Sequence, residues 1–114
     1  MRESFAKVIG LDLAKLKMED VELLAENLER FLYEELEKRG LTIFDVHIGI
    51  DVRVLDVLLV TVDLTVNSPV ALGPEILARF DEAIDTALAR FEKYLFLSSH
   101  SGEGKVSGSP EAPS

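Results

Sequence analysis

Hydrophobic residues along the chain change their spacing twice, and these changes divide it into helical and extended segments. Over residues 19–39 they recur every three or four positions, as on one face of an α-helix; the set is Val21, Leu24, Ala25, Leu28, Phe31, Leu32 and Leu36. Gly40 follows this run and suits the left-handed position that ends many helices. Residues 74–96 repeat the helical spacing, beginning at Pro74, a residue favoured in the first turn. The pattern therefore predicts two long helices.

Between these helices, hydrophobic and polar residues alternate, which is typical of half-buried antiparallel strands. The even-numbered positions are apolar: Phe44, Val46, Ile48, Ile50 and Val52 in one run, and Leu58, Val60, Val62, Leu64 and Val66 in the next. This predicts a hairpin whose even-numbered side chains face the core. The turn near residues 54–56 lacks an Asn-Gly or Asp-Gly pair, so Ile50 is expected opposite either Val60 or Val62.

The first residues carry a weaker pattern. Phe5, Ile9, Leu13 and Leu16 follow helical spacing, with Gly10 in the middle, which predicts a short helix or a bent helical entry. The expected fold is α+β, a two-layer sandwich of order (α)-α-β-β-α. In it, a long antiparallel hairpin is covered on one face by helices.

The chain is expected to form one domain over residues 1–97, followed by a disordered tail over residues 98–114. The tail has 11 Ser, Gly or Pro residues among 17, with Val106 as its only large aliphatic residue. Such a segment buries too little apolar area to offset the entropy lost on ordering.

Composition narrows the classes of function. Cysteine is absent, which excludes disulfides, zinc–thiolate sites and thiol nucleophiles. The N-terminus lacks the apolar segment of a signal peptide, and no apolar run is long enough to span a bilayer, so we expect a cytoplasmic protein without a membrane partner. A net charge of −9 disfavours broad binding to nucleic acid. Abundant Glu with few Asn and no Gln is typical of thermophilic proteins.

The strongest candidate for chemistry is His47. On a strand it shares a face with Asp45 and Asp51, and it is expected opposite Asp63 or Thr65, depending on register. An imidazole between carboxylates can bind a metal or act as a general base. A metal or catalytic site needs three or more convergent groups in a cleft, however, and a hairpin face is flat. The favoured interpretation is a solvated strand face with no metal, cofactor or catalytic residue.

Two further residue sets are candidates for binding partners. Basic residues of the two helices predict a small surface for RNA contact: Lys38, Arg39, Arg79, Arg90 and Lys93. Acidic residues interleave with them, so ordinary ion pairing on solvated helix surfaces is the favoured interpretation. Apolar residues expected outside the core predict an interface between subunits or with a protein partner: Ile43, Val57, Leu59, Phe96 and Leu97.

The segments "LLVTVDLTVNSP" and "ILARFDEAIDTALARFEKYL", together with the acidic first helix, resemble a small archaeal family of uncharacterised proteins. This family is a domain of unknown function often encoded near the prefoldin β subunit. The resemblance covers roughly residues 19–96. It implies an archaeal cytoplasmic protein with a role around protein or RNA maturation, and it brings no catalytic or binding residues to this chain.

A two-stranded sheet is marginally stable alone, and its edges carry unpaired backbone groups. The chain is therefore expected to form a homo-oligomer, either a dimer or a higher even assembly. The leading hypothesis for function is a non-catalytic module for protein–protein interaction or assembly. The alternative is an RNA-associated accessory protein that uses the basic helix surface.

Overall fold

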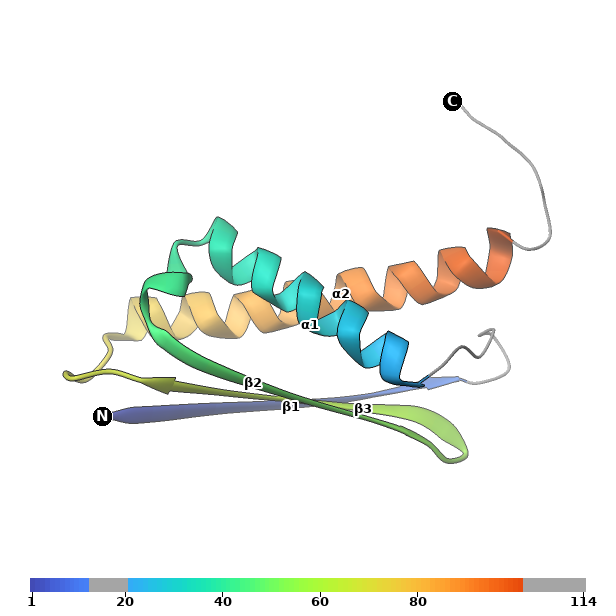
Figure 1. The fold of residues 1–114 in the computed structure, drawn as a ribbon, viewed down its shortest axis with the longest axis horizontal. Coiled ribbons are helices and arrows are strands. Elements are labelled where there is room, and N and C mark those ends of the chain that lie inside the picture. The colour runs from blue at the N-terminus through green and yellow to red at the C-terminus, as the bar shows by residue number, and fades with distance from the viewer. Residues whose placement is uncertain (13–20, 102–114) are drawn as a thin grey trace, which may run out of the picture.

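The computed structural model describes residues 1–12 and 21–101, with side chains as far as Phe96 (Figure 1). Its elements are strand β1 (Arg2–Asp12), helix α1 (Val21–Lys38), a short 3-10 turn η2 (Leu41–Ile43), strands β2 (Asp45–Val54) and β3 (Val57–Asn67), and helix α2 (Pro74–Ser101). The two long helices and the hairpin expected from the hydrophobic pattern are confirmed.

The three strands form one antiparallel sheet in the order β1-β3-β2. The last strand in the chain therefore lies in the centre, with β1 and β2 at the edges. Of the two registers expected for the hairpin, the structure has Ile50 opposite Val62. On the other side of β3, Phe5 is opposite Leu64 and Ile9 is opposite Val60.

The prediction of a helix near the N-terminus is wrong for the residues that the structure describes, because residues 2–12 form the strand β1. Phe5 and Ile9 are four positions apart, a spacing that places them on one side of a helix and equally on one face of a strand. Lys7 lies between them in the same row, so the alternation typical of a strand is interrupted. Leu13 and Leu16 lie outside the described residues.

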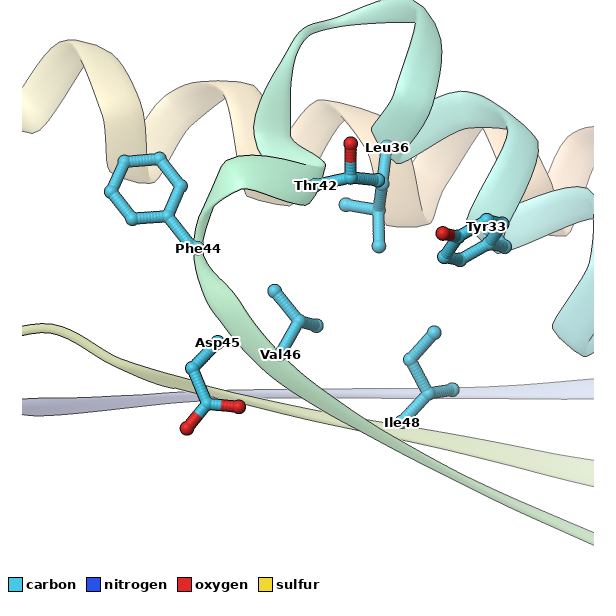
Figure 2. Close-up of a pocket in the computed structure, with 7 residues that line it drawn as sticks. All are labelled: Tyr33, Leu36, Thr42, Phe44, Asp45, Val46 and Ile48. Carbon is cyan, nitrogen blue, oxygen red and sulfur yellow. The ribbon is translucent and has the colours of Figure 1, made fainter.

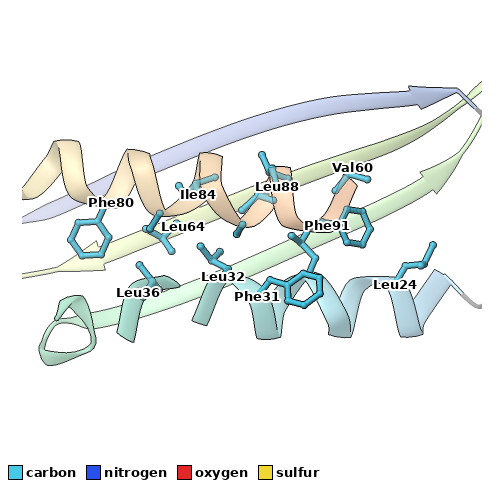
Figure 3. Packing of buried hydrophobic residues seen from close by; sticks show 14 of the residues in the cluster. Leu24, Phe31, Leu32, Leu36, Val60, Leu64, Phe80, Ile84, Leu88 and Phe91 are labelled. Carbon is cyan, nitrogen blue, oxygen red and sulfur yellow. The ribbon is translucent and has the colours of Figure 1, made fainter. Parts of the chain in front are cut away.

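Both helices lie on the same face of the sheet, which confirms the α+β class and the two-layer arrangement (Figure 1). The core between the layers is formed by the apolar faces of α1, α2 and β3 (Figure 3). Leu58, Val60, Val62, Leu64 and Val66 of the central strand are completely buried. Each such side chain contributes roughly 1.5–3 kcal/mol of hydrophobic stabilisation. The edge strands are covered less well, and the helix-facing residues of β2 from Val46 to Val52 are only partly buried.

Three phenylalanines link the edges of the sheet to α2. Phe80 of α2 is fully buried, and its ring centroid lies 5.7 Å from that of Phe5 in β1. On the other side it lies 5.8 Å from the ring of Phe44, the residue just before β2. One aromatic side chain therefore packs against groups from both outer strands.

Helix ends follow the signals in the sequence. Gly40 has a φ of 70°, in the left-handed region that glycine adopts without strain, and it turns the chain from α1 into η2. Pro74 opens α2, and the amides of Ile76 and Leu77 donate to the carbonyl of Gly73.

Helix α2 continues to Ser101, into the first residues of the expected tail. Residues 102–114 lie outside the described part of the chain, so the division into domain and tail stays a prediction. Neither α1 nor α2 is apolar enough over sufficient length to cross a membrane.

Candidate interaction surface

No described element covers the sheet face opposite the helices (Figure 1). It is formed by the even-numbered residues of β1 and the odd-numbered residues of β2 and β3. Many of its residues are small, including Ala6, Gly10 and Gly49, and Val8 is 60% exposed. The face is thus flat, partly apolar and open.

The apolar residues expected at an interface do not lie together in the structure. Val57 and Leu59 lie on the open face, where Leu59 is opposite Gly10 of β1. Ile43 is 83% exposed but lies in η2, at the other end of the hairpin. Phe96 is half-exposed on α2, and the side chain of Leu97 lies outside the described residues. The sequence missed Ala6 and Val8 as part of this face because it did not identify β1 as a strand.

His47 and its neighbouring carboxylates also lie on the open face, but they do not converge. The His47 side chain is 72% exposed, its Nε2 is 3.6 Å from Oδ1 of Asp45, and Thr65 is opposite it across the sheet. Asp51 pairs instead with Arg53, at 2.7 Å, and Asp63 is opposite Gly49. No group of three or more His, Cys, Asp or Glu residues is placed to hold a metal within the described residues. The arrangement is a row of exposed polar and charged side chains along one strand, interrupted by Gly49.

Three of the five basic residues expected at an RNA surface are engaged in ion pairs, Lys38 within α1 and Arg39 and Arg90 also across the two helices. Glu35 of α1 accepts hydrogen bonds from Lys38, Arg39 and Arg90. Arg90 of α2 also binds Glu34 at 2.8 Å, and Arg39 binds Glu82 at 3.2 Å. Arg79 and Lys93 are exposed on α2. The structure therefore does not present the five as a single cationic strip.

The Glu35 carboxylate is the most buried charge in this cluster, with only 4% of its side chain exposed. Burial by itself raises the pKa of Glu35, but the hydrogen bonds from Arg39, Arg90 and Lys38 outweigh it and lower the pKa to about 2. Arg90 in turn lies over the ring of Phe31, 4.6 Å from its centroid. The sequence indicates a Glu35–Arg39 pair from its i,i+4 spacing, but no local signal shows that Arg90 joins it from a helix far along the chain.

The outer edge of β2 borders a groove between this strand and α1 (Figure 2). The groove has a volume of about 270 Å³ and is lined by Tyr33, Leu36, Thr42, Phe44, Asp45, Val46 and Ile48. Figure 2 shows Val46 and Ile48 pointing from β2 toward α1, while Asp45 points to the open face. The apolar row of β2 is therefore accessible from the side at this edge.

The outer edge of β1 differs in its chemistry. Lys7 stands in the helix-facing row, opposite Val62, and its Nζ lies 2.9 Å from Asp81 and 3.2 Å from Asp85 of α2. The hydrogen bonds that Lys7 donates to Asp81 and, with a smaller effect, to Asp85 raise the pKa of Lys7 above its ordinary value. Glu3 stands in the same row, opposite Val66. The β1 edge thus carries charge on its helix side, where β2 carries aliphatic residues.

Among solved structures, the chain is similar to a protein from Thermococcus onnurineus NA1, with 16% sequence identity and a TM-score of 0.60. The match covers 90% of this chain and 99% of that chain. The likeness shows a shared fold, and the organism is an archaeon, which is consistent with the resemblance to an archaeal family. No protein-family model and no curated protein matches the sequence.

Proposed function

We propose that this protein is a non-catalytic assembly module that acts as a homo-oligomer through its sheet. The observation that carries the proposal is a three-stranded sheet whose described helices both lie on one face, while the other face includes exposed aliphatic residues such as Val8 and Val57. Sheets with an open face and unpaired edges are ready surfaces for association with another chain.

The chemistry of the open face agrees with association better than with catalysis. The charged side chains that β2 contributes to it are exposed, and Asp51 pairs with Arg53 of the same strand. General acid–base catalysis requires a positioned group within hydrogen-bonding reach of a bound substrate. A flat face offers area for a partner and little enclosure for a small molecule.

The test is the molar mass of the purified full chain, measured by light scattering coupled to size-exclusion chromatography across the micromolar range. We expect a mass twice that of the chain, or a higher even multiple, since closed symmetric assemblies are the commonest outcome for soluble oligomers. A mass equal to one chain at every concentration would overturn the proposal.

The alternative predicted from the sequence is an RNA-associated accessory role. Its remaining exposed cations are Arg79 and Lys93, while the other three pair with Glu34, Glu35 or Glu82. Retention on RNA that weakens as salt is raised, and that is lost when Arg79 and Lys93 are both changed to Glu, would favour this alternative. The archaeal resemblance is compatible with either role, since it implies work around protein or RNA maturation.

A further inference from the structure

We propose that two copies of the chain pair through the outer edges of β2, antiparallel and around a twofold axis at Gly49. This inference rests on the proposed function and names its partner surface. The product is a continuous sheet of six strands, with the three strands of each copy on either side of the axis.

The sequence of β2 is complementary to itself when it is reversed. In "DVHIGIDVR", residues 45–53, pairing around Gly49 places Asp45 opposite Arg53 of the second copy and His47 opposite its Asp51. Both pairings occur twice because of the symmetry. On the helix side, Val46 is opposite Val52 and Ile48 is opposite Ile50. The Asp45–Arg53 pairs have opposite charges, and opposite charges and β-branched pairs are the cross-strand neighbours that stabilise antiparallel sheets.

Neighbouring registers lose this complementarity. Paired residues in an antiparallel sheet share a face, so the register can shift only by moving the axis one residue at a time along β2. With the axis at Ile48, Asp45 stands opposite Asp51 of the second copy. With the axis at Ile50, His47 stands opposite Arg53 and Asp45 faces an aliphatic residue, Leu55. The charge pattern therefore selects the register centred on Gly49.

The helix side of the same edge also fits a second copy. Val46, Ile48, Ile50 and Val52 are only partly buried, although their partners in β3 are completely buried. The groove beside α1 leaves Val46 and Ile48 accessible from the edge. In the paired arrangement, Ile50 and Val52 of the second copy come alongside these two residues and extend the apolar layer across the axis.

The β1 edge is less suited to such pairing. Inward-pointing charged residues on edge strands are one device by which proteins prevent edge-to-edge association. Lys7 occupies such a position and is held by Asp81 and Asp85. The corresponding row of β2 contains no charged residue from Val46 to Val54. The two edges are therefore chemically distinct, and β2 is the one that accepts another strand.

The test is a charge exchange at the pair farthest from the axis. The variant Asp45→Arg places two arginines opposite each other, and Arg53→Asp places two aspartates opposite each other. Each variant alone is expected to weaken self-association about ten- to a hundredfold. When the two are mixed, both outer pairs become attractive in the heterodimer, so association returns toward the wild-type level. Differential labels on the two chains identify the mixed species in a pull-down, and light scattering gives its mass.

Asp63→Arg is the matched control, because Asp63 is exposed on the same face but lies on the central strand, opposite Gly49. Under β2 pairing it leaves the mass unchanged, whereas association through the open face would be altered by it. If the wild type is oligomeric and the two exchange variants retain its mass, or if mixing them restores nothing, β2 pairing is wrong while the proposed function stands. A monomeric wild type would overturn both.

Discussion

Glu35 joins the two helices through a carboxylate that is almost inaccessible to solvent. Its partners come from both helices, with Lys38 and Arg39 in the last turn of α1 and its C-terminal end, and Arg90 in α2. Removing one member of a buried ion cluster usually costs more than the pair contributes, because the remaining charges lose their compensation. The cluster therefore fixes how α1 sits beside α2.

Replacing Glu35 by Gln should lower the free energy of unfolding by about 2 kcal/mol, less than for a wholly buried pair because Arg39 and Arg90 retain some contact with water. Chemical denaturation followed by circular dichroism measures the change. Glu37→Gln is the control, since Glu37 is exposed on the same helix and its change should stay within about 0.5 kcal/mol. Equal effects of the two substitutions would contradict the assigned role.

The same carboxylate should make stability depend on pH in the acid range. The pKa of Glu35 is about 2 in the folded chain and near its ordinary value of 4.5 when the chain is unfolded. Because the folded-state pKa is the lower one, its contribution is present above about pH 4.5 and is lost as pH falls toward 2. The stability difference between wild type and Glu35→Gln should therefore shrink over this window. A difference that stays constant from pH 5 to about pH 2 would show that the ionised carboxylate is not responsible.

The limit of sequence reasoning at this scale is the distance along the chain between partners. Helical spacing predicts the Glu35–Arg39 pair because both residues fall in the helix expected over residues 19–39. Arg90 is 55 residues from Glu35, and only the packing of α1 against α2 brings them together. The same packing removes Arg39 and Arg90 from the basic surface that the sequence predicts.

At the scale of elements, β1 changes how the sheet is completed. It pairs with β3 along its whole length, from Arg2 opposite Asn67 to Asp12 opposite Val57. The hairpin and both long helices could be predicted because their periods, two and 3.6, are distinct and sustained. β1 could not, because Glu3 and Lys7 interrupt its apolar row and leave Phe5 and Ile9 at a spacing common to both periods.

Phe80 should show how strongly the two outer strands depend on α2. Changing it to Ala removes the ring that packs against Phe5 and Phe44 and leaves a cavity in the core, so the free energy of unfolding should fall by about 3–5 kcal/mol. Thermal or denaturant unfolding measures this loss. Val70→Ala, at a position that is 66% exposed, should change stability by less than about 0.5 kcal/mol. A Phe80 variant as stable as the Val70 variant would contradict this view of the core.

At the scale of the whole molecule, the two edges of the sheet are expected to differ in how fast their amides exchange with deuterium. If β2 pairs with a second copy, its amides that point away from β3 become hydrogen-bonded and should exchange slowly with deuterium. The outward amides of β1 have no described strand beside them and should exchange rapidly. Hydrogen exchange read by NMR or mass spectrometry, at concentrations above and below the oligomer midpoint, measures this asymmetry. Equal exchange at both edges would contradict it.

For the candidate interaction surface too, sequence reasoning is limited by contacts between segments that are far apart in the chain. The sequence correctly places His47, Asp45 and Asp51 on the face of the hairpin away from the core. It does not show that β2 is an edge, because that depends on β1 pairing with the other side of β3. The self-complementary order of charges in β2 indicates pairing with a second copy only once β2 is known to be an edge strand.

The salt bridges of Lys7 have a consequence for how far assembly can proceed. A molecule with two equivalent adhesive edges has a valence of two and can add copies without limit, as fibrils do. If two copies pair through β2, the molecule has a valence of one, because Lys7, anchored to Asp81 and Asp85, keeps a charge on the inner side of β1. Growth then stops after a single addition, and the particle stays finite at any concentration. A single buried-side lysine on an edge strand can thus separate a discrete complex from a polymer.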